Sequence, residues 1–209
     1  MFINVSPQIL CFDFTDVRTT GCFFHLAQNG MKRLQKLKYN NENLFKRYGL
    51  NHTFQEEIRM IHALAFLDPG EISDAFQIVY NNISNEAKTY GDQFFRIYVA
   101  NTARFPKTFW SISGMLNSGM PRTQAWAESF HHQMNAVLDK KHVGIYTFVK
   151  FMKDRFIVVE SDIEASIEGQ PQKKRSSKHF EAGKRALEIL KKKTEIPTLH
   201  LLRAIANNM

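Results

Sequence analysis

Cysteine, glycine and proline are all scarce in this chain of 209 residues. Two cysteines, Cys11 and Cys22, cannot build a disulfide framework, so a secreted disulfide-rich scaffold is excluded. Ten glycines and six prolines indicate few tight turns. No apolar run approaches the roughly 20 residues that span a membrane. Residues 1–14 lack the basic segment and the small-residue cleavage site of a signal peptide. We therefore expect a nuclear or cytoplasmic protein that is not secreted and has no membrane partner.

The positive charge of the chain is concentrated near its C-terminus. The net charge is +8, of which residues 1–170 carry +1 and residues 171–209 carry +7. Such a basic segment attracts polyanions, because binding releases counterions from the phosphates. The candidate phosphate contacts are Lys173, Lys174, Arg175, Lys184, Arg185, Lys191, Lys192 and Lys193. A solvated helix face with a lysine-rich rim is the alternative interpretation.

Hydrophobic periodicity predicts a mainly helical fold with a few short strands. Strands are expected over residues 8–20 and near Phe109–Ile112, where β-branched and aromatic residues gather. Residues 40–50 are polar, with a boundary near Gly49. A capping box at Thr53 and Glu56 predicts the start of a helix that stops at residues 68–70, and the next helix runs from Glu71 through Tyr80. Further helices are expected over residues 22–38, 86–103, 123–138, 144–168 and 176–194, and after Pro197. In the helix over 176–194, the spacing predicts that Leu187, Ile189 and Leu190 pack on the body of the protein.

Cys22 and His25 are the first pair that could carry chemistry. Three residues apart at the start of a predicted helix, they would share one face. A thiolate and an imidazole are zinc ligands, but a closed zinc site needs four ligands and Cys11 is the only other thiol. A buried cysteine beside a hydrogen-bonded histidine is therefore the favoured interpretation.

A second group comprises Glu128, His131 and His132, which would share a helical face. The carboxylate could hold a divalent metal ion with a histidine beside it, although an exposed ion pair is favoured on spacing alone. Asp13 and Asp16 lie near the end of a predicted strand, and Asp13 or Asp16 could join Glu128 in a two-metal site for phosphoryl transfer. An Asp at such a place is more often a turn residue.

Four segments in this order resemble the C-terminal part of Mutator-like element (MULE) transposases: GCFFHLAQN (21–29), LNSGMPRTQAWAESFHHQMN (116–135), KHVGIYTFVKFMKD (141–154) and EGQPQKKRSSKHFEAGKRAL (168–187). The resemblance covers residues 16–195. It implies a truncated RNase H-like core over residues 1–170, a helical insertion at about 40–105, and a basic helical tail over 171–209. In that family, two Asp and one Glu bind two metal ions and cut DNA strands.

The resemblance also implies roles for individual residues. Cys22 and His25 match the family's Cys-x-x-His pair, Glu128 matches the third acidic residue, and His131 matches the histidine that follows it. We expect these four residues to lie together. The first two catalytic Asp have no assigned match in the chain. In the helix that carries Glu128, Thr123 and Asn135 match polar positions of the family, whereas Gln124 and Ala125 stand where it has a pair of Asn.

The function implied is that of a fragment or decayed copy of a MULE-type DNA transposase that retains non-specific DNA binding. We expect it to be catalytically inactive, because too few carboxylates are left to hold the metal ions in position when most of the acidic triad is missing. No cofactor is expected, and Mg²⁺ or Mn²⁺ would be needed only by an active form. Two alternatives remain open. One is an active metal-dependent nuclease completed by Asp13, by Asp16 or by another chain, and the other is a helical protein-interaction module.

Overall fold

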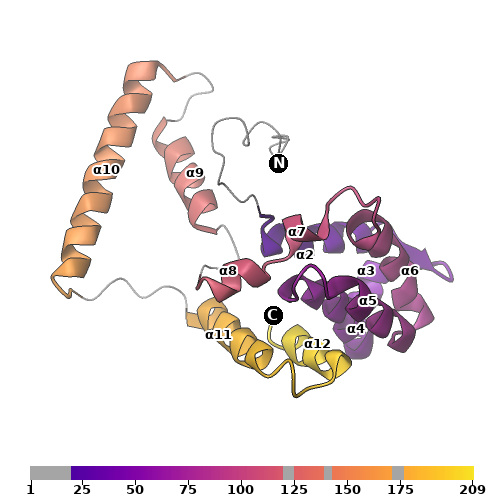
Figure 1. Cartoon of the computed structure of the whole chain (residues 1–209). Coiled ribbons are helices and arrows are strands. Elements are labelled where there is room, and N and C mark those ends of the chain that lie inside the picture. The colour runs from indigo at the N-terminus through magenta and orange to yellow at the C-terminus, as the bar shows by residue number, and fades with distance from the viewer. Residues whose placement is uncertain (1–19, 120–124, 139–142, 171–176) are drawn as a thin grey trace. The chain divides into compact units, whose positions relative to one another are not determined.

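Helices dominate the structure (Figure 1), a computed structural model that describes residues 20–119, 125–138, 143–170 and 177–209, without the side chains of 125–128 and 177–180. The helices are α2 (Phe23–Leu34), α3 (Leu44–Leu50), α4 (His52–Ala63), α5 (Ile72–Asn82), α6 (Asn85–Phe94), α7 (Lys107–Trp110), α8 (Ser113–Asn117), α9 (Ala125–Leu138), α10 (Ile145–Ile167), α11 (Ser177–Lys191) and α12 (Thr198–Ala206). A 3₁₀ turn, η1 (Leu64–Phe66), follows α4, and a π-helical segment, η2 (Phe95–Val99), follows α6. Within the described ranges the strands are β1 (Lys38–Tyr39) and β2 (Glu42–Asn43), which pair antiparallel. The expectation of a mainly helical class is confirmed.

The chain divides into two compact units. Unit 1 comprises Met1–Thr123 and Glu181–Met209, and unit 2 comprises Gln124–Phe180. These units do not follow the expected division at residue 170, because the C-terminal segment supplies part of the core of unit 1. Leu201, Leu202 and Ile205 of α12 are buried there, and so is Ala186 of α11. As the spacing predicted, Leu187, Ile189 and Leu190 also pack against this core.

The core of unit 1 is built around α4. Its residues Ile58 and Ile61 are fully buried, and α12 packs along it while also touching α5. Figure 1 shows α12, in yellow, beside these two helices. An ion pair at the edge fixes the contact, with Arg203 Nε of α12 3.0 Å from Glu56 Oε1 of α4. The C-terminal helix is therefore part of the fold of unit 1.

Asparagine and serine side chains set the starts of three helices. Asn43 accepts hydrogen bonds from the backbone N–H groups of Phe45 and Lys46 at the start of α3. Asn51 accepts one from Phe54 N–H at the start of α4, and Ser84 caps α6 in the same way. The helix predicted to begin at Thr53 is therefore capped two residues earlier, because the side chain of Asn51 accepts the hydrogen bond from Phe54 N–H.

Other expectations were wrong in whole or in part. The helix predicted over residues 22–38 ends at Leu34, and Lys38 lies in β1. The segment near Phe109–Ile112 is not a strand, since Lys107–Trp110 forms the short helix α7 directly after Pro106. Residues 40–50 contain β2 and α3 rather than only a boundary. The helix predicted over 86–103 leaves helical geometry at Ala100, where η2 ends.

Gly30 allows the closest helix packing in unit 1. A Cβ atom at this position of α2 would overlap His62 Nε2 and would lie 2.6 Å from Tyr90 Oη. His62 of α4 and Tyr90 of α6 share a buried hydrogen bond of 2.6 Å. Burial, together with the charge of Arg59, lowers the pKa of His62 from 6.5 to about 4. The neutral imidazole of His62 therefore joins α2, α4 and α6 through these close contacts.

Unit 2 contains α9 and α10, which contact each other through few residues. Phe151 of α10 is buried, and its ring centroid lies 6.0 Å from that of Phe130 in α9. Most of the other large apolar side chains of α10 are exposed. This helix of 23 residues therefore has an apolar surface that α9 does not cover.

Candidate nucleic-acid interface

The structure places the predicted catalytic residues in both units. Cys22 is the N-cap residue of α2 and is buried, as the favoured interpretation expected, and His25 is half-buried one turn later. The backbone of Glu128 lies in α9 of unit 2, and so does His131, whose side chain is exposed. The expected grouping of these four residues joins two units, and it stays a prediction.

Several other predicted positions fall outside the described residues. They include Cys11, Asp13 and Asp16. His132 lies in α9 and is exposed. Among the described side chains, no group of three or more His, Cys, Asp or Glu residues is arranged to hold a metal ion. Within the same ranges, no helix has both the length and the apolar character that crossing a bilayer requires.

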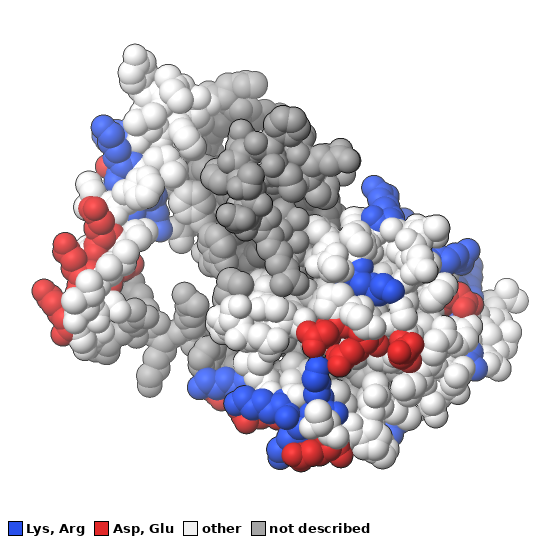
Figure 2. Space-filling model, viewed as in Figure 1, with Lys and Arg blue, Asp and Glu red and all other residues white. Residues whose placement is uncertain are grey.

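Two lysines of α11 lie close to carboxylates of the same helix. Lys191 Nζ is 2.7 Å from Glu188 Oε1, and Lys184 Nζ is 3.8 Å from Glu181 Oε1. Figure 2 shows basic and acidic side chains next to each other in this part of unit 1. Exposed pairs of this kind are worth little to stability, but each carboxylate offsets one positive charge. The tail therefore has fewer unpaired cations than its ten Lys and Arg residues suggest.

The remaining tail residues differ in how they are engaged. Arg185 Nε donates a hydrogen bond of 2.8 Å to Asn208 Oδ1, which is uncharged. Lys192 is exposed, and no described carboxylate lies within ion-pair distance of it. The basic run 173–175 lies outside the described residues. Lys192 is thus the tail lysine whose charge is most available to a phosphate in the described part of the tail.

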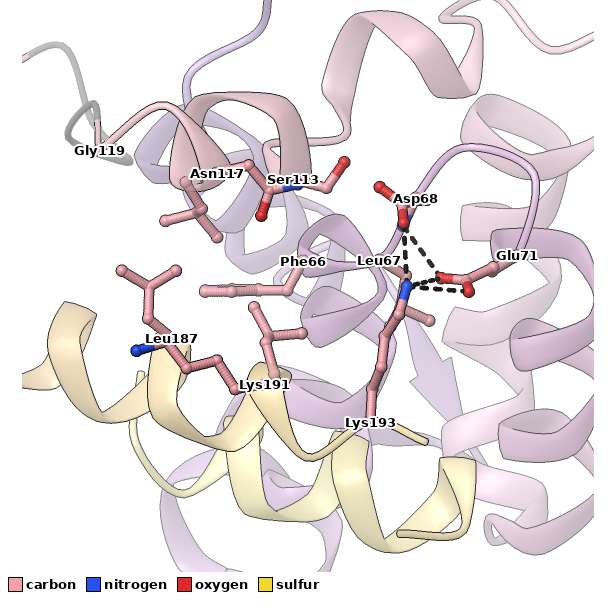
Figure 3. A pocket seen from close by; sticks show the side chains of 12 residues that line it. Phe66, Leu67, Asp68, Glu71, Ser113, Asn117, Gly119, Leu187, Lys191 and Lys193 are labelled. Carbon is pink, nitrogen blue, oxygen red and sulfur yellow. Dashed lines mark hydrogen bonds and ion pairs between the residues drawn. The ribbon is translucent and has the colours of Figure 1, made fainter. Parts of the chain in front are cut away.

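Lys193, in contrast, is held by the body of unit 1. Its Nζ lies 3.0 Å from Asp68 Oδ2 and 3.1 Å from Glu71 Oε1, in the turn that precedes α5 (Figure 3). Hydrogen bonds from Lys193, and then from Ser113, lower the pKa of Asp68. The same bonds to Asp68 and Glu71 raise the pKa of Lys193. This lysine anchors the C-terminal segment and has little charge to offer a ligand.

The anchored lysine lies on the rim of a hollow of about 400 Å³ in unit 1. Apolar side chains line much of it, among them Phe66, Leu116, Leu187 and Leu190. Figure 3 shows the ion pairs of Lys193 at one end and Leu187 of α11 at the other. Because the rim acids are already paired with Lys193, we assign no chemistry to this hollow.

A second basic group lies on α2, the hairpin and α3. We call it the α2–α3 basic surface, and it comprises Lys32, Arg33, Lys36, Lys38 and Lys46. All five side chains are exposed. No Asp or Glu of the described ranges lies within ion-pair distance of any of them. Their charges are therefore open to a ligand.

A tight hairpin brings these five residues together. Asn40 and Asn41 at its tip have positive φ angles of 47° and 65°, which suit a two-residue turn between strands. Lys38 then pairs with Asn43 across the hairpin. Asn43 also donates a hydrogen bond of 2.8 Å to the backbone oxygen of Gln35, just after α2. One asparagine thus joins the end of α2, the hairpin and the start of α3.

Helix stability explains only part of this surface. Lys32 and Arg33 lie in the last turn of α2, where a cation stabilises the negative end of the helix dipole. Lys46, however, lies in the first turn of α3, where a cation is unfavourable. Lys36 and Lys38 lie outside both helices. The group is therefore not accounted for by helix capping alone.

The net charge of residues 1–170, which is +1, does not reveal this surface. A shorter window would have found it, since residues 23–50 contain six Lys or Arg and one Glu, a net +5. The rest of the first 170 residues must then be acidic, which hid the cluster. Comparisons with family models, with curated proteins and with solved structures found no match for the chain.

Proposed function

We propose that the chain binds nucleic acid through phosphate contacts made by the α2–α3 basic surface, with a smaller contribution from the tail. The observation that carries the proposal is the group of five exposed basic side chains without a described acidic partner. Cations of this kind displace counterions from a phosphate backbone, which is the main source of non-specific affinity. Binding would be tolerant of sequence, because phosphate contacts carry no base information.

The resemblance to MULE transposases supports the choice of DNA as the nucleic acid. In this proposal, α3 to η2 belong to the helical insertion that the resemblance implies, and α9 carries Glu128 beside an RNase H-like core. The α2–α3 basic surface then begins at Lys32, seven residues after His25 on the same helix, and continues into the insertion. DNA bound there would lie close to the segment that matches the family's active site.

Charge neutralisation in the full chain tests the proposal. The triple variant Lys32→Gln, Lys36→Gln and Lys38→Gln removes three exposed cations and keeps side chains that suit helix and hairpin. We expect its affinity for a fluorescein-labelled duplex, measured by anisotropy at moderate salt, to fall at least about tenfold, because three phosphate contacts are lost. Deletion of residues 171–209 is not a usable test, since it removes Leu202 and Ile205 from the core.

A matched control removes the same net charge from lysines that are already engaged. Lys88 lies over the Tyr80 ring, Lys107 donates to Ser73, and Lys193 is ion-paired. Changing these three lysines to Gln should leave duplex affinity nearly unchanged. Equal losses in both triple variants would mean that only net charge matters. Undetectable binding by the wild-type chain would refute the proposal outright.

A further inference from the structure

Helix α10 carries an apolar stripe that unit 2 leaves exposed. Six apolar residues follow one another at intervals of four, three, four, three and four: Ile145, Val149, Met152, Phe156, Val159 and Ile163. We call them the α10 stripe. Met152 is half-buried and the other five side chains are exposed. The buried contact with α9 is made by Phe151, which is outside the stripe.

The spacing of the stripe is that of a helix made to pair with another helix. Alternation of four and three gives a mean period of 3.5 residues, the repeat of a coiled coil, in which such positions form the seam. A contiguous exposed apolar strip of this length marks an interaction site in a protein that is otherwise well packed. We therefore expect the α10 stripe to pack against a second helix.

The charges of α10 indicate which partner fits. Lys150, Lys153 and Arg155 lie in its first half, with Asp154 as the one acid there. The second half is acidic. It carries Glu160, Asp162 and Glu164, and Glu168 follows the helix. Figure 2 shows the basic side chains toward one end of this helix and the acidic ones toward the other. A helix with one basic and one acidic half is complementary to a second copy of itself that runs in the opposite direction.

The residues that flank the stripe repeat this pattern in detail. Lys153 and Glu160 occupy the same flanking position one heptad apart, and Arg155 and Asp162 occupy the other. In an antiparallel pair, Lys153 would face Glu160 of the second copy and Arg155 would face Asp162 of the second copy. A parallel pair would keep only the contact of Arg155 with Glu160 and would set the two acidic ends side by side.

We propose that α10 mediates self-association, with the α10 stripes of two copies packed antiparallel. Mutual burial of the stripe removes its apolar side chains from water, and the flanking charges fix the direction. This inference does not depend on nucleic-acid binding. It assigns the exposed face of unit 2 to a second copy of the chain.

Two neighbouring residues provide a matched test of the interface. Phe156 lies in the stripe and Ile157 lies outside it, and both side chains are 63% exposed. Sedimentation equilibrium of the full chain should give a mass of about 49 kDa, twice the 24.3 kDa of one copy. Phe156→Ser should raise the dissociation constant of the dimer at least about 30-fold, as expected for a large central interface residue. Ile157→Ser should leave it within about twofold.

Charge reversal tests the direction of the pair. Lys153→Glu should weaken the dimer about tenfold, because it opposes Glu160 of the second copy with a like charge. Adding Glu160→Lys in the same chain should restore it, since the two charges are then exchanged. In a parallel pair the double variant would instead place the new lysine at position 160 next to Arg155 of the second copy, a like-charge contact. A monomeric wild-type chain, equal effects at residues 156 and 157, or no rescue by the exchange would each overturn the proposal.

Discussion

Replacing Gly30 by Ala would test the packing on which unit 1 depends. The added methyl group would overlap His62 Nε2 and come within 2.6 Å of Tyr90 Oη, two atoms that share a buried hydrogen bond. Neither side chain ends in a flexible group that could move into solvent, because both are almost completely buried. The helix α2 must therefore shift, or the hydrogen bond must break.

The magnitude follows from opposing contributions. Overpacking of a tight core costs about 1–3 kcal/mol, and a buried polar group left without its partner costs about the same again. Alanine recovers about 1 kcal/mol through its higher helix propensity. We expect a net loss of about 3 kcal/mol, which lowers the Tm of a unit of this size by about 6–12 °C.

Thermal unfolding followed by far-ultraviolet circular dichroism measures this loss, with Gly49→Ala as the control. Gly49 also lies within a helix, α3, but a Cβ atom there would meet no atom within 4 Å. This control should be stabilised by up to about 1 kcal/mol. An increase in Tm for Gly30→Ala, similar to that of the control, would refute the close contact of α2 with His62 and Tyr90.

Three further predictions concern pH, the tail and catalysis. Burial lowers the pKa of His62 from 6.5 to about 4. At a pH between these two values, His62 is therefore protonated in the unfolded chain and neutral in the folded chain. The free energy of unfolding should therefore fall as the pH drops through this window, by up to about 3 kcal/mol, and His62→Gln should remove this part of the slope in urea titrations; an unchanged slope would contradict it. Lys193→Gln should lower the free energy of unfolding by up to about 1 kcal/mol and leave duplex affinity unchanged. Lys192→Gln should lower duplex affinity and leave the free energy of unfolding unchanged. The opposite pattern would show that Lys193 contacts the ligand. Finally, the chain alone should not cleave a labelled duplex in Mg²⁺ or Mn²⁺, because one carboxylate, Glu128, holds such an ion weakly. Mn²⁺-dependent cleavage that disappears in Glu128→Gln would instead indicate an active enzyme.

Periodicity alone predicted the long helices well. The apolar spacing over residues 144–168 matches α10 (Ile145–Ile167), because a repeat sustained over several turns outweighs single unfavourable residues. Helix starts were less predictable. Thr53 and Glu56 fit a capping box, yet Asn51 caps the helix, and its side chain accepts a hydrogen bond from Phe54 N–H.

The segment near Phe109 was predicted to be a strand and is not one. The sequence pattern of a short segment does not show which distant residues the segment contacts. Aromatic and β-branched residues favour strands, but no neighbouring strand pairs with this segment in the described structure. Trp110 instead donates a hydrogen bond of 2.9 Å to the backbone oxygen of Tyr98, and Ile112 N–H donates to the backbone oxygen of Ala65. Contacts with distant residues therefore decide the local conformation.

The candidate interface was only partly predictable. The charge of the tail is visible in the sequence, but its pairing is not, since Lys193 and Asp68 are 125 residues apart. The α2–α3 basic surface was within reach of a shorter charge window. Its hairpin depends on two consecutive asparagines with positive φ, and such a pair is a turn signal in the sequence.

The salt dependence of duplex binding tests the central claim most directly. If the five cations of the α2–α3 basic surface each neutralise one phosphate, the log–log slope should be about −4.5. The dissociation constant of the wild-type chain, measured by fluorescence anisotropy, should then rise at least about 500-fold between about 50 mM and about 200 mM salt. The Lys32, Lys36 and Lys38 triple variant, which loses three of these contacts, should show a rise about 40-fold smaller. A slope near zero, or the same slope in both proteins, would contradict nucleic-acid binding at this surface.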